Sequence, residues 1–377
     1  MKLFQKLIVA PAALGFLIPS AAFAEEIKLA DVSNYSSSKE VKSISDFDSA
    51  EELAVTNNRI DGLESRFNDF EAGGFSETTS MKGKVEMLLG ATSTDAGTEE
   101  ALTFNYHYEV DFNTSFTGDD NLNVEIAAGN ETGVNSISNL YNGLGEESDN
   151  LAVEDVNYSF PLGDYKITLG ESLDASKNFP SSCSYSNTLN SMDDCNTGNT
   201  MALGGDISVS AGYDFDNGWS YGVGLSADDG ETAAGMFTAE SDDFYGAAVG
   251  YEGDNYGVTV GYSDIDTATY FGINAMYSPD AVPFTISGGV EYGDVDATGD
   301  SSSWLVGITS DVGEGTIALG VGTLGHIDDD ADEVLGYEVS YDYPLNDGMS
   351  IKPFAFISEV ANADDTTGLG VLTTFKF

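Results

Sequence analysis

The chain has 377 residues, of which 64 are Asp or Glu and only 13 are Lys or Arg, so its formal net charge is −51 at pH 7. This acidic balance argues against nucleic acid as a partner. With 41% hydrophobic and 11% aromatic residues the chain can bury enough surface to exclude disorder, and beyond the N-terminus no run of about 18 apolar residues could cross a membrane as a helix. A large β protein rich in Gly and Tyr remains.

Residues 1–24 have the features of a secretory signal peptide. Lys2 and Lys6 form the charged start, residues 7–18 are mostly apolar, and Ala22-Phe23-Ala24 provides a small-x-small cleavage site. The sequence therefore predicts export of residues 25–377 from the cytoplasm.

The two cysteines, Cys183 and Cys195, would then reach an oxidising compartment. We expect them to form one disulfide, with two free thiols as the alternative. The sequence has no Cys-x-x-Cys motif and no cluster of histidines, which argues against a zinc site. No metal and no cofactor is expected.

Two segments separate the predicted signal peptide from the rest of the chain. Residues 25–48 are polar and rich in serine, and we expect them to form a flexible leader. Ser49 and Glu52 form a capping box that opens a helix over residues 49–72. Its apolar positions follow a heptad seam: Leu53, Thr56, Ile60, Leu63, Phe67 and Phe70. The seam predicts a self-associating coiled coil, with a lone amphipathic helix packed on its own domain as the alternative.

From residue 79 to residue 377 the hydrophobic period is two, which gives strands with one apolar and one polar face. Turn signals divide this region into about sixteen strands, at 79–92, 101–116, 121–132, 151–161, 165–173, 206–215, 219–227, 244–252, 256–264, 269–278, 284–294, 303–311, 316–325, 334–343, 349–359 and 367–377. Alternation alone would also fit a soluble sandwich. Because tight turns alternate with mostly longer links, we predict an all-β fold, a 16-stranded antiparallel transmembrane β-barrel.

Aromatic side chains crowd the predicted tight turns, as expected of a girdle at a membrane interface. They are Tyr158, Phe160, Tyr165, Tyr213, Phe215, Trp219, Tyr221, Tyr251, Tyr256, Tyr277 and Phe284. The last strand carries Phe375 and the terminal Phe377, which resembles the C-terminal signature by which outer-membrane barrels are recognised for insertion. We therefore expect the barrel-assembly machinery to be a partner.

Short motifs at the two ends of the chain are similar to those of one group of porins. They are MKLFQKL at 1–7, VSNYS at 32–36, VKSISDF at 41–47, RIDGLESR at 59–66, FSETT at 75–79, IKP at 351–353 and TTFKF at 373–377. In these motifs the chain resembles the cyanobacterial outer-membrane iron-uptake porins, relatives of the OprB-type carbohydrate-selective porins. The resemblance implies an outer-membrane channel for small solutes such as iron or other inorganic ions, with carbohydrates as a further class.

The chain departs from that family at one point. Family members usually carry a peptidoglycan-tethering SLH domain between the serine-rich leader and the coiled coil, whereas here residues 45–48 run directly into the predicted helix at Ser49. The sequence leaves no room for that domain, and peptidoglycan attachment is therefore unsupported for this chain.

Charged residues on the polar faces of the predicted strands are candidates to line the channel. They are Lys84, Glu86, His107, Glu109, Asp111, Glu125, Asp155, Lys166, Asp214, Glu291, Glu338 and Asp342, to which Lys352 and Lys376 are added on the basic side. Beyond residue 84 the chain holds 51 acids and 4 bases. Because rings of carboxylates favour cations, we predict a water-filled, cation-preferring channel. Inward glycines such as Gly246 and Gly250 fit an open lumen, or simply sheet packing.

The sequence gives little support for an enzyme. His107 and His326 are the only imidazoles, and His107 beside Glu109 and Asp111 is more simply an ordinary lumen residue than a fragment of a triad. The acidic run at residues 328–333 lacks the Gly and the spaced Glu of an EF-hand. We expect a solvated outer loop there, with weak divalent bridging to lipopolysaccharide as the alternative.

The longest predicted link, residues 174–205, is the third that points outward. About thirty residues without secondary structure indicate a functional loop, and in other sixteen-stranded porins this loop folds into the barrel as its constriction. Cys183 and Cys195 would close a ring within it that is worth on the order of 3 kcal/mol. Asp193 and Asp194 are then candidates to face the ion path, with a rigid extracellular cap that no solute touches as the alternative.

Together these features predict a porin of the cell outer membrane that lets small solutes diffuse passively. Outer-membrane lipids and lipopolysaccharide would surround it, and it would form a homotrimer, because the heptad seam indicates self-association and sixteen-stranded porins associate in threes. The alternative is an acidic secreted or surface β protein that binds divalent cations and has a structural or adhesive role.

Overall fold

The computed structural model describes residues 78–94, 102–130, 137–141, 149–238, 241–329 and 331–377. The chain divides into two compact units, Met1–Asp69 and Phe70–Phe377, and every described residue belongs to the second. The predicted signal peptide, leader and coiled-coil helix at residues 1–72 lie outside the described residues.

The second unit is built from sixteen long strands and one very short strand. They are β1 (Thr79–Thr94), β2 (Thr103–Thr114), β3 (Asn121–Gly129), β4 (Ala152–Leu162), β5 (Tyr165–Glu171), β6 (Ile207–Asp214), β7 (Trp219–Ala227), β8 (Asp243–Glu252), β9 (Tyr256–Asp264), β10 (Ala268–Tyr277), β11 (Phe284–Val295), β12 (Gly299–Val312), β13 (Gly315–Thr323), β14 (Ile327–Asp328), β15 (Leu335–Asn346), β16 (Met349–Ser358) and β17 (Thr366–Lys376). The helical pieces are α4 (Ile137–Leu140), η3 (Asn190–Asn196) and α5 (Gly198–Met201). None of the described helices is long and apolar enough to span a bilayer.

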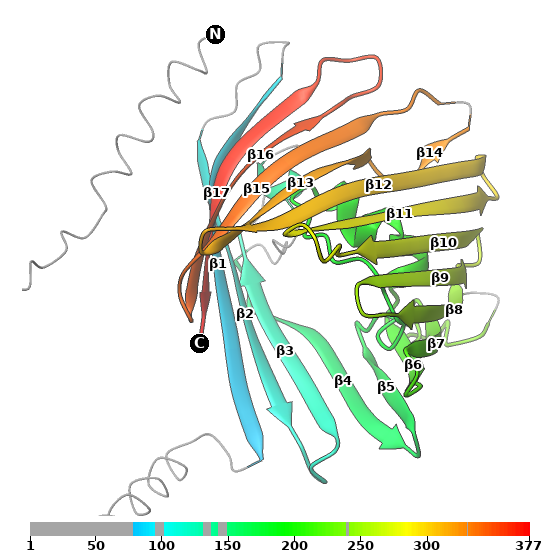
Figure 1. Cartoon of the computed structure of the whole chain (residues 1–377). Helices are drawn as coiled ribbons and strands as arrows, with labels where there is room; N and C mark the ends of the chain where they lie inside the picture. The colour runs from blue at the N-terminus through cyan, green and yellow to red at the C-terminus, as the bar shows by residue number, and fades with distance from the viewer. Residues whose placement is uncertain (1–77, 95–101, 131–136, 142–148, 239–240, 330) are drawn as a thin grey trace, which may run out of the picture. The chain divides into compact units, whose positions relative to one another are not determined.

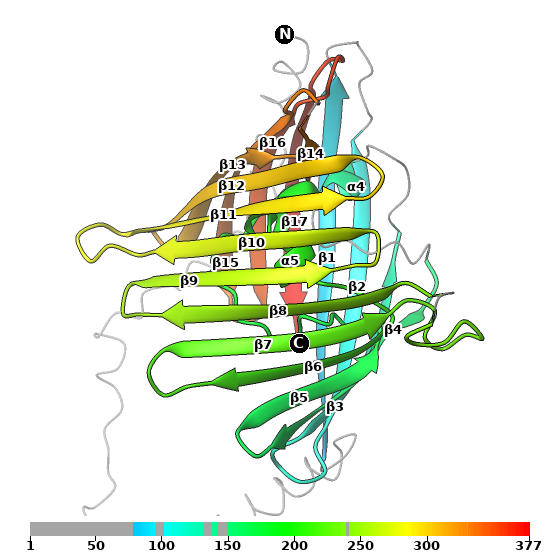
Figure 2. The same ribbon diagram turned by 90° about the vertical axis from the view of Figure 1, so that its right-hand side faces the viewer.

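The long strands close into one antiparallel barrel (Figures 1 and 2). Each pairs with its neighbours in sequence, and β1 pairs with β17 from Lys84↔Lys376 to Thr94↔Thr366, so the sheet has no open edge. This confirms the predicted 16-stranded barrel, and each predicted strand is present. β12 begins at Gly299, earlier than predicted, because its first residues pair with the end of β11 through Val295↔Gly299 and Asp294↔Asp300, and Ser301 and Ser302 also pair with β14.

One end of the barrel carries tight turns and both ends of its chain, and we call it the turn end. Three of the turns contain only two residues, at 163–164, 313–314 and 347–348. In the first two, Gly163 and Gly313 adopt φ values of +65° and +68°, which glycine tolerates without steric cost. The opposite end, which we call the link end, carries the longer links. Two links at that end, residues 265–267 and 296–298, are as short as turns, so the alternation is less strict than the sequence indicated.

The outer face of the barrel is apolar. Side chains of the predicted apolar phase, such as Val223, Val249 and Leu319, are 47%, 48% and 48% exposed, which is costly in water and favourable in lipid. Near the turn end, aromatic rings contact one another as the sequence predicts. Examples are Tyr158–Phe160, Tyr213–Phe215, Trp219–Tyr251 and Tyr251–Tyr256, with ring centroids 5.4, 4.6, 5.1 and 5.8 Å apart. This ring of aromatics marks one membrane interface.

Candidate functional site

The strand registers place the predicted lumen residues on the inner face of the barrel. Lys84 lies opposite Glu109, and Glu86 opposite His107, while Asp111, Glu125 and Asp155 form one row across three strands. The same face continues through Lys166, Asp214, Glu291, Glu338 and Asp342, which lie opposite Gly212, Ser220, Gly272, Gly320 and Thr316. The alternating pattern therefore identified the correct phase of these strands.

The wall formed by β2, β3 and β4 stays accessible from the lumen and carries a row of carboxylates. Asp111, Glu125 and Asp155 are all only half-buried. Asn123 Nδ2 donates to Asp111 Oδ1 at 2.7 Å, and Asn157 Nδ2 donates to Asp155 Oδ2 at 2.7 Å. These amides fix the two outer carboxylates of the row, so that negative charge is held at one level of the lumen.

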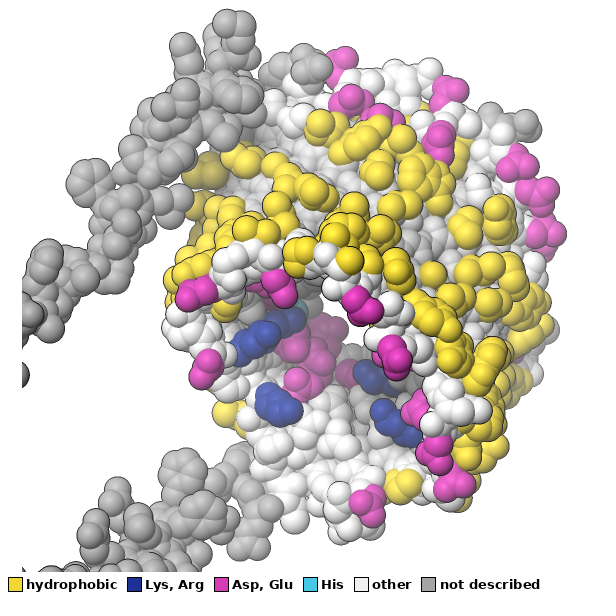
Figure 3. All heavy atoms as spheres, viewed as in Figure 1, with side chains coloured by type: hydrophobic (Ala, Val, Ile, Leu, Met, Phe, Trp, Pro, Cys, Tyr) yellow, Lys and Arg dark blue, Asp and Glu magenta, His cyan; other side chains and the backbone are white. Residues whose placement is uncertain are grey.

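Lysines of the inner face are fewer than its carboxylates, and one of them is paired. Lys84 Nζ lies 2.9 Å from Glu109 Oε2 and 3.4 Å from Glu86 Oε2, so its charge is offset by two carboxylates. Figure 3 shows acidic and basic side chains gathered around the hollow of the barrel, whereas apolar side chains cover its outside. The polar hollow can hold water and ions.

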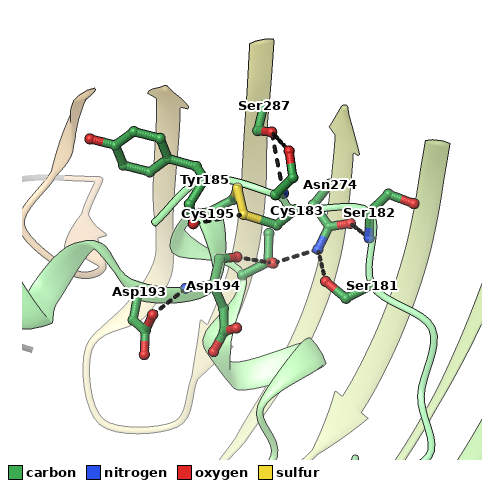
Figure 4. The surroundings of a disulfide bond; sticks show 11 residues. Ser181, Ser182, Cys183, Tyr185, Asp193, Asp194, Cys195, Asn274 and Ser287 are labelled. Atoms are coloured by element: carbon green, nitrogen blue, oxygen red, sulfur yellow. Dashed lines mark hydrogen bonds between the residues drawn. A yellow bond between two sulfur atoms is a disulfide. The ribbon is translucent and has the colours of Figure 1, made fainter. Parts of the chain in front are cut away.

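Residues 172–206, the link between β5 and β6, fold into the barrel, and we call them the inner loop. Ser182 N donates to Asn274 Oδ1 at 2.8 Å, and Ser184 Oγ lies 2.8 Å from Ser287 Oγ on the inner wall (Figure 4). Its α5 contacts β8, β9 and β10, and η3 contacts β11, β12 and β13. The loop therefore occupies the lumen, and an extracellular cap, the alternative reading of the sequence, is not what the structure has.

Two buried glutamates of the wall hold the inner loop. Glu338 accepts bonds from the Tyr185 hydroxyl at 2.7 Å and from the backbone N–H groups of Thr188 and Leu189 at 3.0 and 2.7 Å. Glu291 accepts from Thr200 N at 2.7 Å and from Asn199 Nδ2 at 3.0 Å. The prediction that both line an open path is wrong, because the loop covers them and leaves them 6% and 0% exposed. They are anchors, and their charges are satisfied by donors.

The inward-facing Gly246 and Gly250 leave space that the inner loop occupies, so the prediction of an open lumen at these positions is wrong. A Cβ atom added to Gly246 would lie 3.0 Å from Leu203 Cδ2, and one added to Gly250 would lie 2.7 Å from Pro180 Cβ. Both neighbours belong to the inner loop. The missing side chains allow the loop to pack directly on the sheet.

The inner loop is amphipathic. Leu173, Tyr185, Leu189 and Met192 are buried against the wall, whereas its exposed edge is polar. That edge includes Asp174, Lys177, Ser181, Ser184, Ser186, Asn190, Ser191 and Asp193. The apolar residues of this loop are a signal for inward folding that is present in the sequence and independent of the loop length.

Asp193 and Asp194 lie where the loop curls back on itself. Asp193 is exposed and Asp194 is half-buried, and both carboxylates point away from the disulfide between Cys183 and Cys195 (Figure 4). Burial, with the negative charges of Asp193, Asp174 and Glu291 nearby, raises the pKa of Asp194 to about 6. Its charge therefore changes close to neutral pH.

The curl itself is an uncommon backbone conformation. Asp194, Cys195 and Asn196 have φ values of +48°, +55° and +57°, which cost of the order of 1 kcal/mol or more for residues other than glycine. The conformation is held by Asn196, whose Nδ2 donates to the carbonyl oxygens of Trp304 and Thr323 at 2.8 and 2.7 Å. Wall contacts thus fix the shape of the loop at this point.

The two histidines occupy different places. His107 is 8% exposed on the inner face of β2, and its Nδ1 has no hydrogen-bond partner among the residues that the structure describes. His326 follows β13, with Nε2 2.9 Å from Glu291 Oε1 and Nδ1 3.0 Å from Ser301 Oγ. The contact between His326 and Glu291 has no signal in the sequence, because the two residues are 35 positions apart. Within the described ranges, no three His, Cys, Asp or Glu residues come together as metal ligands.

Comparison with known proteins agrees with this geometry. The model of a family described as Gram-negative porin matches residues 81–365. An uncharacterized protein of Nostoc sp. is 30% identical over 135 residues, and the alignment spans 32% of this chain and 24% of that protein. The chain thus spans about a quarter of the length of this relative.

Solved structures of porins share the fold. A loop-deletion mutant of OmpT, an outer membrane protein of Vibrio cholerae, has a TM-score of 0.57 at 12% identity and covers 80% of this chain and 99% of its own. An anion-selective porin from Comamonas acidovorans has a TM-score of 0.55 at 12% identity with the same coverage. A mutant of the Rh. blastica porin has a TM-score of 0.51 at 13% identity, with 79% and 100% covered. At these identities the likeness concerns the fold alone.

Proposed function

The chain belongs to the Gram-negative porin family and is an outer-membrane channel, and we propose that small solutes diffuse through it passively with a preference for cations. The observation that carries the proposal is the acidic lining of the space between the β2–β4 wall and the exposed edge of the inner loop. Asp111, Glu125 and Asp155 face this space from the wall, and the loop adds Asp174 and Asp193. Carboxylates that surround a narrow path attract cations and repel anions.

The bases near this path are fewer than the acids. Lys84 is held by Glu86 and Glu109, Lys82 lies opposite Asp111 in the strand register, and Lys177 is the one base on the exposed edge of the loop. Salt at about 0.1 M screens exposed charges beyond about 10 Å, so charges beside the path matter more than those of distant links. The fold alone does not decide the sign, since one structural neighbour is described as anion-selective.

For the solute we propose small inorganic cations, iron included, with carbohydrates as a second class. This proposal rests on the resemblance of the chain ends to iron-uptake and carbohydrate-selective porins. The polar side chains of the lumen can bond either class. A secreted adhesive β protein, the alternative derived from the sequence, has no specific observation in its favour.

The remaining organisation is proposed on the sequence. A cleaved signal peptide at 1–24, a polar leader at 25–48 and a coiled-coil helix at 49–72 would precede the barrel, and the seam would support a homotrimer. Phe375 and Phe377 would present the insertion signal to the barrel-assembly machinery. The backbone of Phe377 bonds Gly83 at 2.8 and 3.0 Å, so the chain end lies at the closure of the barrel.

Reversal potentials test the proposed selectivity. For the purified channel in a planar bilayer under a KCl gradient, we expect a reversal potential with the sign of a cation-preferring pore. Reversal at the opposite sign would contradict cation preference, and absence of any conductance in correctly folded protein would contradict the channel itself.

A further inference from the structure

We propose that Ile137–Tyr141, in the link between β3 and β4, act as a brace for the inner loop, so that two loops together set the size limit of the channel. We call this segment the brace. The proposal rests on the proposed function as a diffusion channel. Tyr141 is then a positioning residue. It affects the solute path indirectly, because it holds the inner loop in place.

The brace lies inside the barrel and joins the inner loop directly. Tyr141 forms an isolated antiparallel β-bridge with Leu189, and Tyr141 N bonds Ile137 O at 3.1 Å, which closes one helical turn. α4 contacts β1, β17 and η3. Ile137 is 0% exposed and Tyr141 6% exposed. The segment is therefore packed between the wall and the inner loop.

The contacts of the brace are apolar on the wall side. The Tyr141 ring lies 4.9 Å from that of Phe354, which stacks in turn on Phe356 at 6.3 Å. Ile137 belongs to the same buried cluster as Leu88. Aromatic pairs at these distances add attraction beyond simple burial.

A half-buried lysine, Lys352, links the two loops. Lys352 Nζ lies 5.7 Å from the centre of the Tyr141 ring, in the range of a cation–π contact, and 3.3 Å from the carbonyl oxygen of Asn187 in the inner loop. Asn187 is followed by Thr188 and Leu189, which are anchored by Glu338. Loss of the Tyr141 ring would thus loosen the same stretch of the inner loop that Glu338 holds.

Together the brace and the inner loop fill one side of the lumen. Their apolar side chains join inward residues of β1, β12, β13, β16 and β17 in one buried cluster: Leu88, Ile137, Tyr141, Tyr185, Leu189, Met192, Cys195, Leu305, Ala318, Phe354, Phe356 and Leu372. Such a cluster is close-packed and excludes water. The solute path is consequently confined to the β2–β4 side, and its width depends on how firmly the inner loop is held against the opposite wall.

The test compares channels that differ only at the brace. Tyr141→Ala is expected to raise single-channel conductance and to shift the exclusion limit for neutral polyethylene glycols toward larger polymers. Tyr141→Phe keeps the ring and should behave as wild type. Tyr262→Ala removes an equally large side chain, 43% exposed on the outer face of β9, and should leave both quantities unchanged.

The outcomes separate this proposal from the function on which it rests. A folded Tyr141→Ala channel, judged by heat-modifiable migration, with wild-type conductance and exclusion limit would overturn the brace. If Tyr141→Ala does not assemble, Tyr141→Leu keeps an apolar side chain but lacks the ring over Lys352, and the same two measurements on it decide. Wild-type protein that folds but does not conduct would instead contradict the proposed function.

Discussion

The inner faces of β2–β4 and of β10–β16 have the same alternating sequence pattern, but their inward side chains have different surroundings in the folded barrel. On β2–β4 the carboxylates of Asp111, Glu125 and Asp155 remain accessible. On β11 and β15 the carboxylates of Glu291 and Glu338 lie under the inner loop. An inward glutamate therefore has two possible roles, as a charge beside the path or as an anchor beneath a loop, and the strand pattern does not distinguish them.

The largest effect is expected from removing an anchor. Glu338→Ala leaves the Tyr185 hydroxyl and the Thr188 and Leu189 N–H groups without their acceptor, and each buried unsatisfied donor costs about 1–3 kcal/mol. We expect a large fall in the urea concentration at which the barrel unfolds. The matched control is Glu125→Ala on the accessible wall, for which little change is expected. Equal losses in the two variants would contradict the distinction between the two faces.

A smaller effect on stability is expected from the disulfide. Cys183 and Cys195 are separated by 12 residues, and cross-linking a ring of this size is worth about 3 kcal/mol in the chain-entropy model. Replacing both by Ser should lower the free energy of unfolding by that order. Mean conductance should change little, since Glu338, Glu291 and Asn196 still fix the loop. If the unfolding midpoint of the wild-type protein is the same with and without reductant, the disulfide does not contribute to stability.

The barrel was predictable because its signals are local. Alternation places each strand and its phase within a few residues of sequence, and the observed registers agree with it. The roles of Glu291 and Glu338 were not predictable, because their partners lie 91 to 153 residues away in the inner loop. The inward fold of the brace was likewise hidden, since Ile137 and Tyr141 show no period that separates them from an ordinary outward link.

Selectivity should respond to the accessible wall and not to acids elsewhere. Replacing Asp111 and Asp155 by Asn and Glu125 by Gln removes three carboxyl groups beside the path with little change in volume. We expect the reversal potential in a KCl gradient to move toward zero. Asp254→Asn, at an exposed turn between β8 and β9, is the control and should leave the potential unchanged. A triple variant with wild-type selectivity would place the selective charges on the inner loop alone.

The smallest expected effect is a change of selectivity with pH that originates in Asp194. Burial raises the pKa of this carboxyl to about 6 from an ordinary value of 3.8, so it is charged at pH 7 and mostly neutral at pH 5. Because protonation removes a negative charge from the inner loop, cation preference should fall as pH is lowered through this window. Exposed carboxylates with ordinary pKa values stay ionised there.

The Asp194→Asn variant isolates this contribution. It lacks the titrating group at all pH values, so its cation preference at pH 7 should already be slightly lower than that of wild type, and the difference between the two proteins should vanish near pH 5. The wall carboxylates and all other ionisable groups are present in both channels, so their contributions cancel in the comparison. A difference that persists unchanged from pH 7 to pH 5 would mean that Asp194 acts through packing and not through its charge, and the exposed Asp193 beside it would then carry the charge of this part of the loop.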